Sequence, residues 1–547
     1  MKKLLLIIGL ISLQANAQLF SNKEEFTRQD TLRGSNTSYR DWWDVKHYKI
    51  SVEPDFKSKS IKGETIISFD VIKKSKSTEL QIDLQAPMEI TSAKINGKEI
   101  KAWARDGNVF FIQVGDNLKK TGNKLVLGFD GIPREAKNPP WDGGWIFRKD
   151  EKGREWMSVA CQGLGASVWF PNKDYLGDEP DNGIELEIIT PKDLVGVGNG
   201  RLVGQKSIGD KIAYTWKVVN PINNYNIIPY IGKYVNFKDS YNGEKGKLDL
   251  DYYVLDYNLE KAKVQFEQGK TMLKSFEYWF GPYPFYEDSF KMIESPHLGM
   301  EHQSGIAYGN KFKNGYLGRD LSGTGWGLKW DFIIVHEAGH EWFGNNITNK
   351  DVADMWIHEG FTSYSESLHT EFLFGKEAGG DYVRGTRAGI ANKKPLIGVY
   401  GVNNEGPGDM YNKGANVIQT LRTWMNNDEK FRKILRGMNK KFYHQTVTTK
   451  QIEDYLAKES GLNLNAFFNQ YLRTKDVPVL EIKKENNAIL YRYYNVVDGF
   501  DMPLRLEGNK ITLKPTKEWK TLNEGNFNSS FDIKVNPNYY IETIVIK

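Results

Sequence analysis

The stretch FIIVHEAGHEWF, residues 332–343, decides the fold prediction for this chain. Its apolar start and its aromatic end predict a buried helix. Because residues four apart on a helix lie one above the other, the imidazoles of His336 and His340 can reach the same metal ion. Glu337 would then lie close to a water on that ion and could take its proton. The stretch therefore predicts a metal-dependent hydrolytic site built on a helix.

A carboxylate that could complete this site is Glu359, in the stretch WIHEGF at residues 356–361. It lies nineteen residues beyond His340, which allows a turn and a second helix that returns to the two imidazoles. Zinc suits two imidazoles and one carboxylate, with a fourth position left for water. We therefore predict one Zn²⁺ per chain, held by His336, His340 and Glu359. His358 competes as a ligand, but it would project from another side of the helix, which favours a structural role.

The composition is that of an ordinary globular protein, with 39% hydrophobic and 26% charged residues. A length of 547 residues exceeds what one hydrophobic core supports, so several domains are expected. Cys161 is the only cysteine, which excludes an internal disulfide and a cysteine-based metal site. The ligands of a metal must therefore be histidines and carboxylates.

The domain order predicted from the sequence is β, then α-rich, then β. Alternating apolar residues from Ile61 to Val71 predict a strand with one buried face, within a β-rich region from about residue 44 to 254. Helical spacing follows from Asn258, a predicted cap, to a Gly281-Pro282 stop, and continues to about residue 472. Short strands return after Pro478. We predict domains at residues 18–257, 258–475 and 476–547.

Two local patterns inside the α-rich region carry further predictions. Thr448 and Gln451 form a capping-box pattern that predicts the start of a helix. The segment from Lys291 to Tyr308 is predicted as an edge strand, whose backbone could hold an extended peptide by strand addition.

Residues 1–17 have the pattern of a signal peptide. Lys2 and Lys3 are followed by an apolar stretch and by the small-residue site Ala15-Asn16-Ala17; a buried N-terminal strand is the alternative. The sequence thus predicts export to a periplasm or to the exterior, without membrane insertion after signal removal. Loss of this segment would leave a formal net charge of +3, which is too weak and dispersed to indicate binding of nucleic acid.

Four separated motifs resemble the aminopeptidase N family of zinc metallopeptidases, the gluzincins that include the leukotriene-processing hydrolase. They are DVKHY at residues 44–48, FGPYPF at 280–285, LGMEH at 298–302 and YNKGA at 411–415. The resemblance implies a multidomain α+β fold. Its expected parts are an N-terminal β-saddle domain, a thermolysin-like α/β zinc-peptidase domain and a small C-terminal β-sandwich-like domain.

The resemblance also implies an aminopeptidase that acts on peptides with a free N-terminus, and a role for each matched residue. Glu337 would be the general base, and Tyr411 would donate its hydroxyl to the oxyanion. Glu301 would bind the substrate α-ammonium with help from Gln162. Gly299 and Met300 would contact the substrate.

The chain departs from the family pattern at four positions close to these motifs. Leu298 replaces a glycine, His302 and His358 each replace an asparagine, and Glu341 replaces a glutamine. Because these changes surround the site without removing a ligand or the base, the preferred N-terminal residue cannot be copied from relatives.

Three other functions remain open at this stage. A zinc endopeptidase would share the metal and base but would cut inside chains. An inactive peptide-binding module would not need Glu337 and Tyr411. Epoxide hydrolysis, a side activity of one relative, also stays open, as do the physiological substrate and the oligomeric state.

Overall fold

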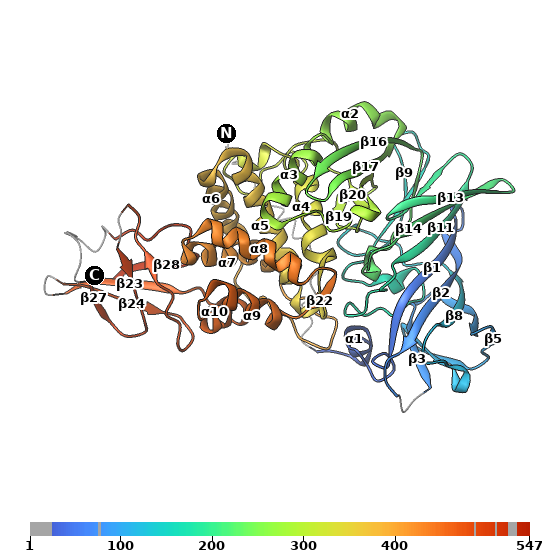
Figure 1. Cartoon of the computed structure of the whole chain (residues 1–547), viewed down its shortest axis with the longest axis horizontal. Coiled ribbons are helices and arrows are strands. Elements are labelled where there is room, and N and C mark those ends of the chain that lie inside the picture. The colour runs from blue at the N-terminus through green and yellow to red at the C-terminus, as the bar shows by residue number, and fades with distance from the viewer. Residues whose placement is uncertain (1–24, 75–77, 486–487, 509–510, 523–532, 547) are drawn as a thin grey trace, which may run out of the picture.

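The computed structural model describes residues 25–74, 78–485, 488–508, 511–522 and 533–546. The predicted signal peptide, residues 1–17, lies outside the described residues. A β-rich part lies at one end, a helical part in the middle and a smaller β-sheet part at the other end (Figure 1). The predicted order of β, α-rich and β regions, and with it the multidomain α+β class, is confirmed.

The N-terminal part is built on a large twisted sheet whose strands alternate between buried and half-buried positions. In β2 (Ser60–Val71), the side chains of Ile61, Ile67 and Phe69 are buried, as the alternating pattern predicts. The sheet has the order β13-β14-β11-β1-β2-β8-β4-β5. The other strands of this sheet are β13 (Arg201–Ile208), β14 (Lys211–Val218), β11 (Ile184–Pro191), β1 (Trp43–Asp55), β8 (Asn123–Gly131), β4 (Glu89–Ile95) and β5 (Lys98–Glu99).

Two smaller sheets and one helix complete the N-terminal part. Met157 pairs with Ile231, so strands far apart in the chain lie side by side there. The four-stranded sheet has β12 (Val195–Val197), β15 (Tyr230–Gly232), β10 (Glu155–Ala160) and β9 (Gly144–Lys149) in that order. The three-stranded sheet has β3 (Glu79–Asp83), β7 (Val109–Gln113) and β6 (Trp103–Asp106), and the helix is α1 (Arg28–Gly34).

A five-stranded sheet joins the N-terminal part to the helical part. Its order is β16 (Tyr234–Gly243), β17 (Gly246–Leu255), β18 (Phe290–Glu294), β20 (Ile306–Tyr308) and β19 (Gly299–Met300). β17 and β18 are parallel, with Leu250 opposite Phe290 and Tyr253 opposite Ile293. Strands β16 and β17 precede the predicted boundary at residue 257, whereas β18 follows it. One sheet is therefore shared by both predicted domains.

The prediction of one edge strand from Lys291 to Tyr308 is wrong. The segment forms three short strands, and only β19 lies at the edge of the sheet, because β18 pairs on both sides. Pro296, which has no N–H to donate to a strand partner, interrupts the segment after β18. Ser304, at φ 49°, reverses the chain before β20.

The helical part holds the residues of the predicted metal site. The helical spacing after Asn258 is divided between α2 (Leu259–Gln265) and α3 (Gln268–Phe280), and Gly281 at φ 95° ends α3 as predicted. The capping box predicted at Thr448 and Gln451 is confirmed. The remaining helices are α4 (Phe332–Gly339), α5 (Trp356–Phe374), α6 (Lys376–Gly385), α7 (Asp409–Met425), α8 (Asp428–Lys441), α9 (Thr449–Ser460) and α10 (Asn465–Arg473), and a strand pair joins β21 (Ile347–Asn349) to β22 (Gln445–Val447).

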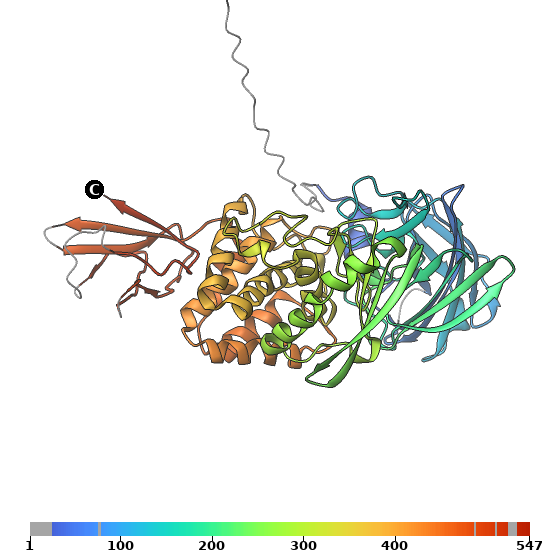
Figure 2. The same cartoon turned by 90° about the horizontal axis from the view of Figure 1, so that it is seen from above.

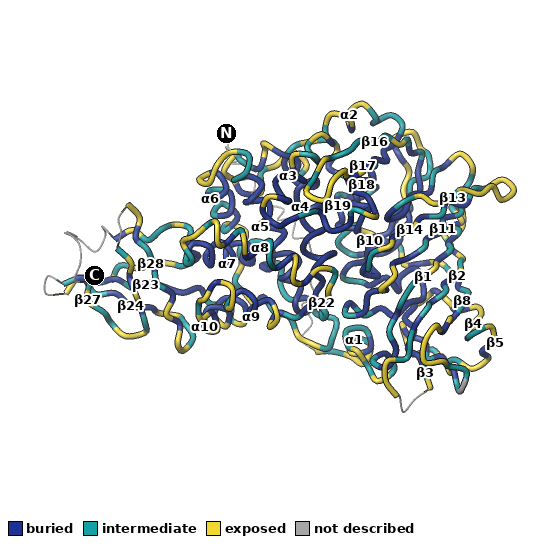
Figure 3. Tube along the Cα trace, in the orientation of Figure 1, coloured by how far each residue is buried: buried dark blue, intermediate teal, exposed yellow. Residues whose placement is uncertain are grey.

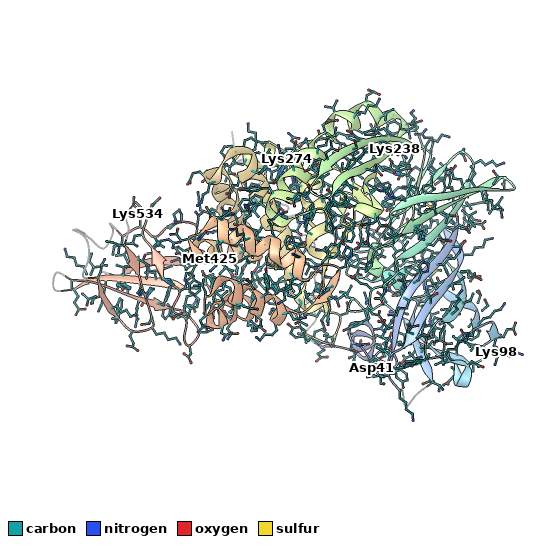
Figure 4. The ribbon with its side chains drawn as sticks, viewed as in Figure 1. Asp41, Lys98, Lys238, Lys274, Met425 and Lys534 are labelled. Carbon is teal, nitrogen blue, oxygen red and sulfur yellow. The ribbon has the colours of Figure 1, made fainter. Side chains whose placement is uncertain are left out.

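The C-terminal strands project from the helical part at the end of the molecule opposite the large sheet (Figure 2). Met425, the last residue of α7, marks the side where the helices meet these strands (Figure 4). Backbone and side-chain hydrogen bonds join the two parts, such as Tyr540 N to Thr420 Oγ1 at 2.9 Å. The strands are β23 (Val479–Glu485), β24 (Ala488–Tyr494), β25 (Leu504–Arg505), β26 (Thr512–Leu513), β27 (Lys520–Leu522) and β28 (Glu542–Ile546).

The most continuously buried segments run through the middle of the molecule, where α4 and α5 pack against the shared sheet (Figure 3). All residues of α4 are buried. Among the described residues, no helix is long and apolar enough to cross a membrane.

The N-terminus of α4 is fixed by a buried carboxylate, that of Asp331. Its side chain accepts hydrogen bonds from the backbone N–H groups of Ile333 and Ile334, at 3.0 and 3.3 Å. It also accepts 2.7 Å hydrogen bonds from the Tyr308 hydroxyl and the Asn310 amide. One carboxylate thus caps α4 and ties it to the end of β20.

We expect Asp331→Ala to lower the free energy of unfolding by about 2–4 kcal/mol, because it removes a cap and leaves buried donors unpaired. Calorimetric melting would measure the loss. Asn427→Ala, which removes an exposed cap of α8 alone, should cost only about 1 kcal/mol. Equal losses for the two variants would contradict the linking role of Asp331.

Candidate metal centre and peptide site

The two histidines of the HEAGH stretch lie on one face of α4 and at its C-terminal end. Their rings are buried, and the ring centroids are 5.0 Å apart. Phe343 and Gly344 then leave the helical conformation, and Gly344 adopts φ 132°, which favours glycine. The chain can therefore turn away after His340 and return through β21 to α5.

Glu359, in the first turn of α5, completes the predicted ligand set. Its Oε2 atom is 3.4 Å from His340 Nε2 and 3.8 Å from His336 Nε2. The three ligand atoms lie within 4.8 Å of one another. Glu359 Oε2 is buried and accepts no hydrogen bond from a protein group. The structure thus brings His336, His340 and Glu359 together with their lone pairs facing one point.

The other ring nitrogen of each histidine is already hydrogen-bonded. His336 Nδ1 donates to Glu366 Oε1 at 2.7 Å, and His340 Nδ1 donates to the Phe343 carbonyl at 3.0 Å. These bonds place the proton on Nδ1 and leave Nε2 free to bind a cation. Glu366 was missed in the sequence, although it lies two helical turns beyond Glu359 on α5 and so faces the same side.

Acidic side chains dominate the charge of this site. Burial opposes the imidazolium form of His340, but Glu359 and Glu301 together raise its pKa to about 10. Burial raises the pKa of Glu337 to about 7. Among the described residues, no lysine or arginine forms an ion pair with Glu301, Glu337, Glu359 or Glu366. An excess of buried negative charge beside two free imidazole nitrogens fits a divalent cation.

Glu301, directly after β19, belongs to the same buried cluster. Glu301, Glu337 and His340 each offer an atom within 4.8 Å of the other two. The Gln162 amide donates to Glu301 Oε1, and the Tyr225 hydroxyl donates to the same atom at 3.1 Å. Glu301 is buried and is therefore no surface ion-pair residue. Tyr225 was missed, because it lies 76 residues before Glu301 in a part of the sequence without a motif.

Gly299 and Met300 form β19 and are buried. A Cβ atom added to Gly299 would lie 2.6 Å from Glu337 Oε1, so only glycine lets the strand approach this carboxylate. The backbone of β19 thus passes directly beside Glu337.

Tyr411 enters the site from α7. Its ring stacks on the His336 ring at a centroid distance of 6.0 Å. A Cβ atom added to Gly414 would be 2.7 Å from the Gly360 Cα, so two facing glycines let α7 approach α5 closely. Burial, and then the Glu359 carboxylate, raise the pKa of the Tyr411 hydroxyl well above its usual value. The hydroxyl therefore keeps its proton at neutral pH and can donate it in a hydrogen bond.

His358 lies away from the ligand set. Its Nε2 atom accepts a 2.9 Å hydrogen bond from the Asn349 backbone N–H, which ties α5 to β21. His302 likewise contacts the Tyr230 hydroxyl behind β19 rather than the metal ligands.

Comparison with known proteins connects this geometry to one peptidase family. Residues 264–471 match the model of the peptidase family M1 domain. "Probable aminopeptidase 2" of Sulfurisphaera tokodaii is 22% identical over 519 residues, which cover 90% of this chain and 62% of that protein. "Aminopeptidase M1" of Arabidopsis thaliana is 22% identical over 81% of this chain and 52% of its own length. The chain thus spans about half to two thirds of these relatives.

A solved structure shares the fold over most of the chain. An M1 zinc metallopeptidase from Deinococcus radiodurans, solved as a mutant with a Tyr-Ser-Ala substrate, has a TM-score of 0.67. It is 18% identical and is matched over 80% of this chain and 96% of its own. Together with the matching family model, this likeness confirms the resemblance to the aminopeptidase N family.

We expect Glu366→Ala to weaken Zn²⁺ binding by about 10–100-fold, because the His336 ring loses the partner that orients it. Titration of the metal-free protein with Zn²⁺ against a competing chelator would measure the change. Glu377→Ala, at an exposed position of α6, should leave the affinity as it is. An unaltered affinity in Glu366→Ala would refute the orienting role.

Proposed function

Since residues 264–471 constitute a peptidase family M1 domain, we propose that this protein is a zinc-dependent aminopeptidase that hydrolyses the N-terminal peptide bond of peptides. The observation that carries the proposal is the convergence of His336 Nε2, His340 Nε2 and Glu359 Oε2 beside Glu337. The donor set, with both Nδ1 atoms already engaged, fits one Zn²⁺ per chain.

In this proposal, His336, His340 and Glu359 hold the metal. Bound zinc supplies a Lewis acid, which polarises the scissile carbonyl and makes water more acidic. Glu366 and the Phe343 carbonyl keep the two imidazoles oriented, so that the metal position is set by the folded chain.

Glu337 acts as the general base. Its carboxylate takes a proton as water attacks the peptide carbonyl, and it then returns the proton to the leaving amine. Burial supports this role, since a pKa raised to about 7 suits a group that must both accept and release a proton near neutral pH. The Tyr411 hydroxyl donates a hydrogen bond to the oxygen on which negative charge develops.

Glu301 makes the enzyme an exopeptidase. A free α-ammonium group would pair with its buried carboxylate, while the Gln162 and Tyr225 hydrogen bonds hold that carboxylate in place. A substrate without the charged amine would leave Glu301 desolvated and unpaired. This cost favours aminopeptidase action over endopeptidase action.

We further propose that the protein is exported. The support is the three-part pattern of residues 1–17, with its small-residue site before Gln18. Mass spectrometry of the exported protein should find Gln18 as the first residue.

Tyr411→Phe should lower kcat by about 10²–10³-fold, because one hydrogen bond to the oxyanion is lost. The variant should keep its zinc, since the phenol is no ligand of the metal. Steady-state kinetics and metal analysis of the same preparation check both parts. Unchanged kcat would remove Tyr411 from the reaction.

The protein should cleave a dipeptide with a free amine and leave its N-acetylated form intact, and a chelator should abolish cleavage. Glu301→Gln should reduce kcat/KM for the free dipeptide by at least about tenfold, through loss of a buried charge pair. Efficient hydrolysis of the acetylated dipeptide would instead identify an endopeptidase.

A further inference from the structure

A small cavity adjoins the metal ligands on the side of α7. It has a volume of about 300 Å³, and Gln162, Met355, Glu359, Glu405, Met410 and Tyr411 are among the residues that line it. Three of these residues belong to the proposed peptide site. The other three, Met355, Glu405 and Met410, carry no role in the mechanism.

Glu405 is the unusual member of this lining. Its side chain is 6% exposed, and its buried Oε1 atom accepts no hydrogen bond. Within the described ranges, no lysine, arginine or histidine forms an ion pair with it. Burial raises its pKa to about 7, and no cationic side chain offsets that effect. A buried carboxylate without a partner costs stability, which indicates a site that waits for a cationic ligand.

The loop that carries Glu405 is held in place by hydrogen bonds on both sides. Asn403 donates to the Gly163 carbonyl at 3.3 Å, and Gly401 N donates to Asp351 Oδ2 at 2.9 Å. Asn404 Oδ1 accepts from Val399 N at 2.9 Å within the loop. The carboxylate is therefore positioned by the fold, and the cavity wall is already formed without a ligand.

The cavity begins where the proposed ammonium site ends. Gln162 donates to Glu301 Oε1, and the same amide nitrogen lies 3.9 Å from Met355 Sδ. In a peptide, the α-ammonium and the first side chain leave the same carbon atom. When Glu301 holds the ammonium and Glu359 lies beside the scissile bond, the first side chain must enter the adjoining space.

We propose that this cavity selects peptides whose first residue is lysine or arginine, with Glu405 as the residue that sets the preference. The inference rests on the proposed aminopeptidase function and names its substrate class. Met355 and Met410 pack along the aliphatic stem, since thioethers adapt to irregular shapes, and the carboxylate pairs with the cationic head. An acidic first residue is rejected, because it would place two carboxylates in one buried space.

Norleucine matches the stem of lysine and lacks its charge, so it isolates the contribution of Glu405. For the zinc-loaded full-length protein, kcat/KM should be at least about tenfold higher for a lysine amide than for the norleucine amide, since a site with an unpaired buried charge discriminates against the neutral side chain. In Glu405→Gln, the ratio of the two constants should fall by about tenfold or more. Glu260→Gln, at an exposed position of α2, should keep the wild-type ratio.

The outcomes separate the two levels of the proposal. A wild-type ratio near one, or the same ratio in Glu405→Gln as in the wild type, overturns the role of Glu405 while leaving the aminopeptidase function in place. The second result would follow if Glu405 held the α-ammonium, because both amides would then lose equally. Failure of the zinc-loaded protein to cleave any free-amine amide would remove both the function and the inference. A lysine preference that disappears in Glu405→Gln alone supports the proposal.

Discussion

Uncompensated negative charge in the interior is the constraint on which this structure depends. Glu301, Glu337, Glu359, Glu366 and Glu405 are all buried around one small region, and among the described residues no lysine or arginine pairs with them. Such an arrangement is costly in a folded protein. It becomes favourable when external cations enter, and each carboxylate has a suitable candidate: a divalent metal, an α-ammonium group or a basic side chain. The site is therefore built for ligands that bring positive charge.

The sequence predicted the metal ligands because their geometry is local. His336 and His340 share a helical face by spacing alone, and the short path to Glu359 limits where the carboxylate can go. The partners that orient this set were not predictable in the same way. Tyr225 reaches Glu301, and the loop of Glu405 reaches Gly163, across long separations in the chain that leave no periodic signal. Contacts of this kind are fixed by tertiary packing, which a single sequence does not reveal.

The errors in the fold prediction have physical causes of the same type. Apolar residues from Lys291 to Tyr308 suggested one strand, yet Pro296 and the positive φ of Ser304 divide the segment. The helical spacing from Asn258 to Phe280 is continuous in the pattern, whereas the chain breaks between α2 and α3. Periodicity identifies which face is buried, but turns and breaks depend on individual backbone positions.

The sheet shared by the N-terminal and helical parts limits how the molecule can move. A hinge between the two parts would have to break the backbone hydrogen bonds between β17 and β18, as well as the bond from Gln162 to Glu301. Rigid-body opening of that kind is therefore expensive. Entry of substrate and exit of product must instead depend on smaller displacements at the rim, which makes the mouth of the site, rather than an interdomain swing, the place where turnover is gated.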